Sequence, residues 1–315
     1  MDAHRLDWSK IEELLLTKYL DSSSAIATYR KHRQVFAMLR ELAPDPARIN
    51  DRTILDFKAR LASRRAATIN SLLRTLRTQL RTLKREEIIT RNPFDNHRWM
   101  ERKDPKTKAE YLGNTSHLTV REMLALLRQA DTEWEFADCK SRWRAQRLRA
   151  LVYALLYTGL RKQEALGLKR EDVDIDRNLI WIQDNEFRRL KTESSAQPIP
   201  ICEQAQDVLR DWRSANAGVC FFPRIRDPNQ PWMGGDCRYR PLCQLAKLGN
   251  RAGIQKKVTF LKCRHSFATL LHYLGFTAEQ IARLMRHSNT QTQTSYIQTD
   301  LEQLNEMRSR FRIVG

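Results

Sequence analysis

Residues 261–270 read Leu261-Lys-Cys-Arg-His-Ser-Phe-Ala-Thr-Leu270, and this stretch is predicted to be helical. Two other segments place basic residues at defined turns. Tyr157-Thr-Gly-Leu-Arg-Lys-Gln-Glu164 lies where a helix predicted over about 141–157 should end, because Gly commonly follows a helix. Arg189-Leu-Lys-Thr192 lies in a charged turn between two β-like runs, 179–183 and 197–201.

Together these segments resemble the catalytic domain of the tyrosine recombinase, or phage integrase, family. That family has a Thr-Gly-Leu-Arg turn with a Glu three residues after the Arg, matched here by Arg161 and Glu164. Its Lys in a β-hairpin before a Pro is matched by Lys191, and its Arg-His-x-Phe-Ala-Thr helix by Arg264 and His265. Each piece is weak alone, but their order and spacing agree.

The resemblance continues to the end of the motif and covers essentially the whole chain. The family has a His nine residues before its nucleophilic Tyr, and His287 precedes Tyr296 by nine residues. Residues 20–95 look like the family's helical core-binding domain. We expect Glu164 to orient a neighbour rather than to react, and His265 to be structural.

The chemistry that the resemblance implies explains the residue types. Attack on a phosphodiester builds negative charge on the nonbridging oxygens, which guanidinium groups match in geometry, so Arg161 and Arg264 are the expected clamp. Tyr296 is the expected nucleophile, and its phosphotyrosine would store the bond for religation. The family role implies Lys191 as general acid for the leaving 5′-oxygen. His287 would bond the phosphate or assist proton movement at Tyr296.

Two positions depart from the family pattern. The usual His three residues before the second Arg is Leu261, which cannot exchange a proton. Either Lys262, His265 or water takes over, or the chemistry is slowed by some part of the ~10²–10⁴ that acid–base help contributes. Arg286 replaces the usual Gly before the motif His, where we expect it to add positive charge beside the phosphate and to reduce backbone freedom.

The charge of the chain favours a polyanionic partner. Its 315 residues carry 56 Lys and Arg against 37 Asp and Glu, a formal net charge of +19, which suits DNA, RNA or an anionic membrane, or serves solubility alone. Nine Lys or Arg and no Asp or Glu lie between positions 58 and 85. Within the helix predicted over 67–85, the basic face could be merely solvated, but we expect it to contact DNA. Its residues are Arg74, Arg77, Arg81, Lys84 and Arg85.

The expected fold is mainly α-helical with a small antiparallel β-sheet. We predict a helical core-binding (DNA-binding) domain over 1–100, a polar linker over 101–117 and a catalytic domain over 118–315 that ends in a helical tail. Thr119 and Glu122 form a predicted capping box at the start of the last domain. The tail packs on its own domain or on a neighbouring protomer.

The sequence excludes several classes of protein. The six cysteines form no Cys-x-x-Cys pair, and neither a metal site nor a phosphate-binding loop is evident, so we expect no metal and no cofactor. No run of residues is apolar enough to span a membrane, and we expect a cytoplasmic protein.

The function that the resemblance implies is site-specific DNA recombination on double-stranded DNA, through a 3′-phosphotyrosine and a homo-oligomer, expected to be a tetramer. One alternative is a DNA-binding protein of the same fold with impaired catalysis, which only Leu261 supports. The other is a topoisomerase-like nicking enzyme without partner exchange. The sequence does not distinguish integration from excision, resolution or inversion.

Overall fold

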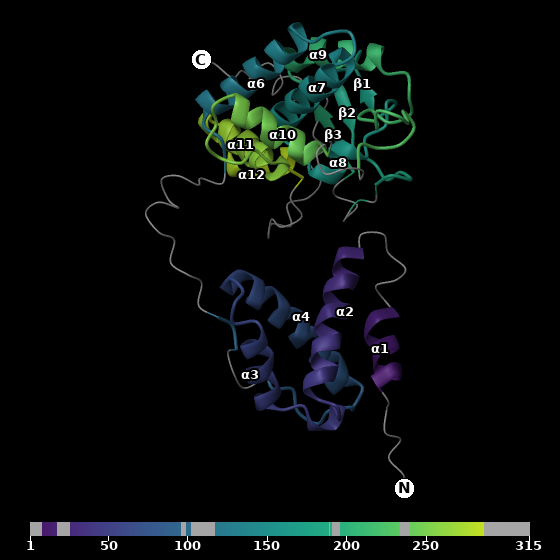
Figure 1. The fold of residues 1–315 in the computed structure, drawn as a ribbon, viewed down its shortest axis with the longest axis vertical. Helices are drawn as coiled ribbons and strands as arrows, with labels where there is room; N and C mark the ends of the chain where they lie inside the picture. The colour runs from purple at the N-terminus through teal and green to yellow at the C-terminus, as the bar shows by residue number, and fades with distance from the viewer. Residues whose placement is uncertain are drawn as a thin grey trace. The chain divides into compact units, whose positions relative to one another are not determined.

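Two compact units make up the chain, Met1–Lys106 and Thr107–Gly315. The computed structural model describes residues 8–17, 26–95, 99–101, 117–188, 190, 196–233 and 240–286. The described parts are mostly helical and include one small sheet, as predicted (Figure 1). Each unit has a hydrophobic core of its own.

The first unit is wholly helical in its described part. The chain order within it is α1 Trp8–Leu16, α2 Ile26–Leu42, a 3₁₀ turn Pro46–Arg48, α3 Asp51–Arg60 and α4 Ala66–Arg85. Asn50 caps the start of α3, because its side chain accepts from the backbone amides of Arg52 and Thr53 at 2.9 and 3.3 Å. Helix α2 packs against α1, α3 and α4, so it is the centre of this unit.

Helix α4 has the two faces that its sequence predicts. Its apolar stripe is buried and forms much of the core of the unit. The residues of this stripe are Ile69, Leu72, Leu73, Leu76, Leu80 and Leu83. Burial of one face fixes the rotation of the helix about its axis, so the basic residues between the leucines are directed to the exposed side.

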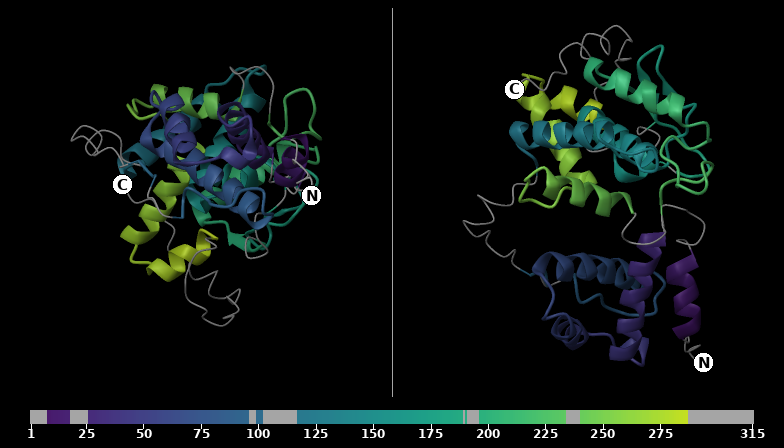
Figure 2. Two further views of the ribbon diagram at one scale, coloured as in Figure 1. Left: turned by 90° about the horizontal axis from the view of Figure 1, so that it is seen from below. Right: turned by 45° about the horizontal axis from the view of Figure 1, so that its top comes forward.

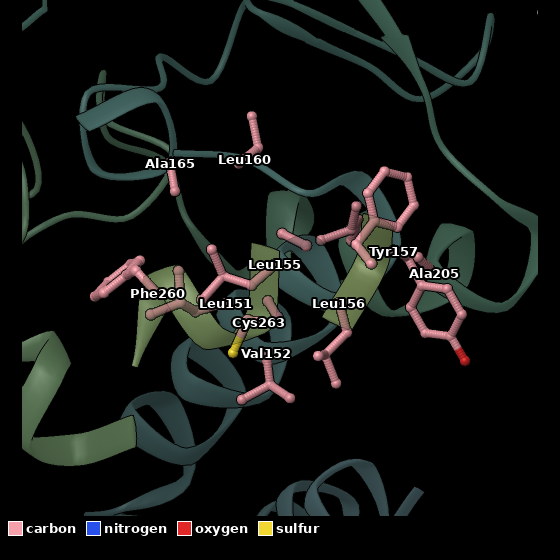
Figure 3. Packing of buried hydrophobic residues seen from close by; sticks show 14 of the residues in the cluster. Leu151, Val152, Leu155, Leu156, Tyr157, Leu160, Ala165, Ala205, Phe260 and Cys263 are labelled. Carbon is pink, nitrogen blue, oxygen red and sulfur yellow. The ribbon is translucent and has the colours of Figure 1, made fainter. Parts of the chain in front are cut away.

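The second unit is built around α7 (Arg142–Thr158). This helix packs most extensively against α6 (Val120–Glu135), α9 (Glu203–Ala215) and α11 (Phe260–Tyr273). Figure 3 shows Leu151 and Leu155 of α7 beside Phe260 and Cys263 of α11 in this core. Because α11 carries the Arg-His motif and α7 ends at the Thr-Gly-Leu-Arg turn, this packing brings the two motifs together.

A three-stranded antiparallel sheet completes the second unit. Its strands are β1 (Val173–Asp174), β2 (Leu179–Trp181) and β3 (Pro198–Pro200), in the spatial order β1-β2-β3. Ile180 pairs with Val173 on one side and with Ile199 on the other. The two β-like runs seen in the sequence are thus paired as neighbours, whereas β1 was not predicted.

Helix α10 (Pro241–Arg251) was also not predicted, although Pro241 at its first position is a common helix start. Two short helices lie near the motifs, α8 (Lys162–Leu166) and α12 (Ala278–Leu284). Helix α12 lies beside α11 in both views of Figure 2. Within the described ranges, no helix is both long and apolar enough to cross a lipid bilayer.

The described residues on either side of positions 102–116 are attached to different units. Asn70 of α4 exchanges two hydrogen bonds with the backbone of Glu101, at 2.7 and 3.0 Å. On the other side, the Leu118 amide donates to Ser266 Oγ of α11 at 2.8 Å. The capping box of Thr119 and Glu122 is present as predicted.

Candidate active site

The turn after α7 brings the first motif directly onto α11. Gly159 ends α7 with a φ of 60°, in the left-handed region that glycine tolerates best. A Cβ at this position would lie 2.3 Å from Phe267 Cδ1, so no larger residue fits without displacement of that ring. The glycine therefore permits both the turn and the close approach of the motif helix.

Arg161 begins the short helix α8 and is held by its own motif partner. Its backbone amide donates to Glu164 Oε2 at 2.8 Å, and its Nη1 donates to Glu164 Oε1 at 2.6 Å. Its Nη2 donates to the backbone carbonyl of Arg286 at 2.6 Å. The guanidinium is thus oriented from two sides, while its side chain remains 37% exposed.

Arg264 of α11 is buried, and its guanidinium lies beside the turn that carries Arg161 and near Glu164. Its Nη1 donates to the Gly159 carbonyl at 2.6 Å, and its Nη2 donates to the carbonyl of Met285. Its Nη1 is 4.0 Å from Glu164 Oε2. Burial, and then the charges of Arg161 and Arg286, lower the pKa of Arg264 to about 9, so it stays protonated at pH 7.

The Arg286 side chain was expected to add positive charge beside the phosphate, but it is buried. Its side chain is directed into the protein, with Nη2 donating to Glu164 Oε2 at 2.7 Å and Nη1 to the Leu284 carbonyl at 2.9 Å. The residue is 4% exposed, so its charge is directed at Glu164 rather than presented at the surface. Its φ of 51° costs a non-glycine residue about 1–3 kcal/mol, in line with the expected loss of backbone freedom.

Glu164 is the carboxylate that these three arginines share. Burial alone would raise the pKa of Glu164, but the charge of Arg286 and the bonds from Arg161 lower it to about 2. One negative charge therefore faces three guanidinium groups at 2.6, 2.7 and 4.0 Å. The cluster carries excess positive charge, which suits an anion such as a phosphodiester.

Arg188 is a further buried arginine that sequence reasoning missed. Its Nη1 donates to the Glu164 carbonyl at 3.1 Å, and its Nη2 lies 3.5 Å from Asp172 Oδ2. Nε and Nη2 also donate to the Gln183 carbonyl, at 2.9 and 2.6 Å. Arg188, three residues before Lys191, thus joins α8 to residues that flank strands β1 and β2. In the sequence it is one basic residue of a charged turn, with no signal to single it out.

The departure at Leu261 leaves an apolar side chain at the surface. Leu261 lies in the first turn of α11 and is 62% exposed. His265, one turn later, is also exposed. Desolvation, and then the charge of Arg264, lower the pKa of His265, so its imidazole is neutral at pH 7 and able to accept a proton.

Three of the predicted catalytic residues, Lys191, His287 and Tyr296, lie outside the described residues. Arg161, Arg264 and the supporting Glu164 are brought together, whereas the side chain of His265 is not part of their hydrogen-bonded cluster. Over the described ranges, no group of three or more His, Cys, Asp or Glu side chains is placed to hold a metal ion.

The predicted basic face of α4 belongs to the first unit. All five of its residues are exposed, but they fall into two groups. Lys84 and Arg85 form ion pairs, with Asp95 at 2.6 Å and with Glu86 at 2.8 Å. Arg74, Arg77 and Arg81 have no ion pair with any residue that the structure describes, so they form the part of this face that is open to an anionic partner.

A sequence profile described as the phage integrase family matches residues 117–303, more than half of the chain. The chain belongs to the phage integrase family. The matched region contains every residue of the arginine cluster as well as Lys191, His287 and Tyr296.

Similar proteins carry recombinase names. Tyrosine recombinase XerA of Thermococcus kodakarensis is 29% identical over 166 residues, which are 52% of this chain and 55% of that protein. Tyrosine recombinase XerC of Actinobacillus succinogenes is 27% identical over 160 residues, 50% of this chain and 51% of that protein. The matches therefore span about half the length of the curated relatives.

Solved structures of integrases share the fold. The Tn1549 transposon integrase, in complex with a circular intermediate DNA, aligns with a TM-score of 0.66 at 17% identity, over 90% of this chain and 92% of that one. A lambda integrase dimer bound to a COC′ core site aligns with a TM-score of 0.61 at 18% identity, over 90% and 94%. At these identities the similarity shows the fold.

Proposed function

We propose that the chain is a site-specific DNA recombinase that cleaves and rejoins double-stranded DNA through a 3′-phosphotyrosine on Tyr296. The observation that carries the proposal is the convergence of Arg161 and Arg264 on Glu164 and on the carbonyls of residues 285 and 286. These two arginines are 103 positions apart in the sequence, and both belong to the recombinase motif. Their surplus of positive charge provides the site for a scissile phosphate.

In the proposed reaction the Tyr296 oxygen attacks phosphorus, and the bond from phosphorus to the 5′-oxygen breaks. Lys191 protonates the leaving 5′-oxygen, and the phenolic proton passes to water or to His287. Arg161 and Arg264 stabilise the charge that develops on the nonbridging oxygens. A 5′-hydroxyl of the partner strand then attacks the phosphotyrosine and releases Tyr296. One phosphodiester replaces another, so no external energy source is required.

The division of labour between domains is part of the proposal. Residues 118–315 would provide the chemistry, residues 1–100 would grip DNA through the basic face of α4, and residues 101–117 would connect the two. Strand exchange needs several active sites on paired duplexes, which suggests a homotetramer on DNA. Arg74, Arg77 and Arg81 support the grip because they are exposed and lie on one helix face.

Covalent trapping on DNA tests the proposal. Duplexes that bind the full chain are selected from a randomised pool and rebuilt with a nick beside each candidate scissile phosphate. The short cleaved end then diffuses away and cannot religate. We expect the wild type to form a denaturation-resistant protein–DNA complex, and Tyr296→Phe to bind the same duplex without forming it.

The outcomes separate the three functions. Covalent complexes together with recombinant products on paired duplexes support the recombinase. Tight binding without covalent complex in the wild type would instead indicate the catalytically impaired DNA-binding protein. Relaxation of supercoiled plasmid without any recombinant product would indicate the nicking enzyme.

A further inference from the structure

Arg286 combines two features that are rarely found together. Its backbone adopts a φ of 51°, which favours glycine, yet it carries one of the largest polar side chains. That side chain is almost completely buried, with 1% of its surface exposed. A strained backbone and a buried guanidinium persist only where the surroundings hold them, so the contacts of this residue indicate its role.

The contacts of Arg286 form a closed ring of hydrogen bonds with Glu164 and Arg161. The Arg286 side chain holds Glu164 Oε2 at 2.7 Å, and Glu164 Oε1 holds Arg161 Nη1 at 2.6 Å. The Arg286 carbonyl then accepts from Arg161 Nη2 at 2.6 Å. Arg161 is therefore fixed twice by the same residue, once through Glu164 and once through the backbone.

We propose that Arg286 is a positioning residue for DNA cleavage, which orients the Arg161 guanidinium through Glu164. The inference rests on the proposed function. Arg286 does not itself meet the scissile phosphate, because its guanidinium is buried against Glu164 and the Leu284 carbonyl. Without the Arg286 side chain, the Glu164 carboxylate would keep only its two bonds from Arg161 itself. The Arg161–Glu164 pair would then sample orientations in which Arg161 does not bind the phosphate.

The test compares the cleavage rate constant at saturating protein with DNA affinity, on the nicked duplex obtained from the randomised pool. For Arg286→Met we expect cleavage to slow by about 10- to 100-fold, as small displacements of clamp groups do. The dissociation constant for DNA should change less than about twofold, because the residue touches no DNA. Arg286→Lys keeps the charge and should cleave faster than Arg286→Met.

Two further variants control the experiment. Arg283→Met removes the same charge from α12, where Arg283 forms an exposed pair with Glu279 at 3.0 Å, and should cleave like the wild type. Glu164→Gln should slow cleavage, and adding Arg286→Met to it should slow the reaction further by less than about twofold. Should Arg286→Met fail to fold, Arg286→Gly removes the same guanidinium while relieving the backbone at φ 51°, and takes its place.

The role of Arg286 is overturned if the folded Met or Gly variant cleaves at the wild-type rate. It is also overturned if the effects of the 164 and 286 substitutions multiply, or if the slower cleavage is wholly explained by weaker DNA binding. A wild type that forms no covalent complex overturns the proposed function, and the positioning role with it. That result needs no variant, so the two failures are distinguishable.

Discussion

Glu164 balances the charge of the site, because in the described part of the chain it is the carboxylate that faces three arginines, at 2.6, 2.7 and 4.0 Å. Its single negative charge offsets the repulsion among the three guanidinium groups. The cluster still keeps a net positive charge that can bind a phosphate. Its pKa of about 2 shows how strongly the folded protein favours the ionised form.

The first prediction concerns the pH dependence of stability at Glu164. The folded-state pKa of about 2 lies below the ordinary value of 4.5, so ionisation stabilises the fold above pH 4.5 and this contribution is lost as the pH falls toward 2. The full contribution is about 3 kcal/mol. Urea unfolding of wild type and Glu164→Gln should give a difference in unfolding free energy that shrinks between about pH 6 and about pH 3, a range that brackets the unfolded-state pKa.

Glu135→Gln at the end of α6, which is exposed, serves as the control for that measurement. Its unfolding free energy should follow the wild type at every pH. A difference between wild type and Glu164→Gln that stays constant over the same pH range would contradict the ionised, ion-paired state of Glu164.

The second prediction concerns Lys191 as general acid. Lys191→Ala should slow cleavage of ordinary DNA by about 10²- to 10⁴-fold, because the leaving 5′-oxygen then departs without a proton. A duplex with sulfur in place of that 5′-oxygen should restore the rate, because a thiolate is a good leaving group without protonation. Arg161→Ala is the control, since its loss affects the nonbridging oxygens and sulfur should not rescue it.

At this scale the sequence predicted residue identities better than side-chain directions. Arg161, Glu164 and Arg264 were assigned from the resemblance to the family motifs, and the structure brings them together. The direction of Arg286 could not be predicted, because it depends on a backbone φ of 51° and on a carboxylate 122 positions away. The role of Lys191 is implied by the family resemblance and stays a prediction.

Among the elements, α4 was predicted best because its pattern is strong. Six apolar positions at three- and four-residue spacing left no other face to bury, and all six are buried. Helix α10 was missed for a local reason. Gly249 resembles a turn residue, but it is small because Val258 packs on it, with Cγ2 2.3 Å from where a Cβ would lie. Strand β1 spans two residues, too few to show the alternation of apolar and polar residues that predicts a strand.

The third prediction concerns the exposed face of α4. Replacing Arg74, Arg77 and Arg81 by Gln should weaken binding to duplexes of any sequence and lower the slope of log affinity against log salt by about 2 to 3, roughly 0.9 for each phosphate that is no longer neutralised. Fluorescence anisotropy over a salt series measures both. The three side chains face solvent, so the melting temperature should hardly change.

A matched triple variant controls for net charge. Arg48, Arg52 and Arg60 are in the same unit, and each is paired on the surface with an acidic residue. Replacing these three by Gln removes the same formal charge. If this variant reduces the salt dependence as much as the α4 variant does, binding follows overall charge, and α4 is not the DNA-contacting face.

In the molecule as a whole, the two units have separate hydrophobic cores. The residues on either side of positions 102–116 are each hydrogen-bonded to their own unit. Trp8, Phe36, Phe57 and Leu76 belong to one core, whereas Trp212 belongs to the other. The sequence predicted helices of both cores, over 67–85 in the first unit and over about 141–157 in the second, but it did not predict α10. The boundaries of 1–100 and 118–315 were drawn from composition alone and stay predictions.

The fourth prediction is that fragments 1–101 and 117–315 each fold alone. Fragment 1–101 keeps the two bonds between Asn70 and the Glu101 backbone, and 117–315 keeps the bond from Leu118 to Ser266. Since each fragment retains its whole core, each should unfold cooperatively in urea, with a midpoint close to one transition of the full chain. Fragment 1–101 should bind DNA with a steep salt dependence that Arg74→Gln, Arg77→Gln and Arg81→Gln together reduce. A fragment that unfolds without a cooperative transition would mean that its core requires the other unit, and the division into a gripping and a cleaving domain would then be wrong.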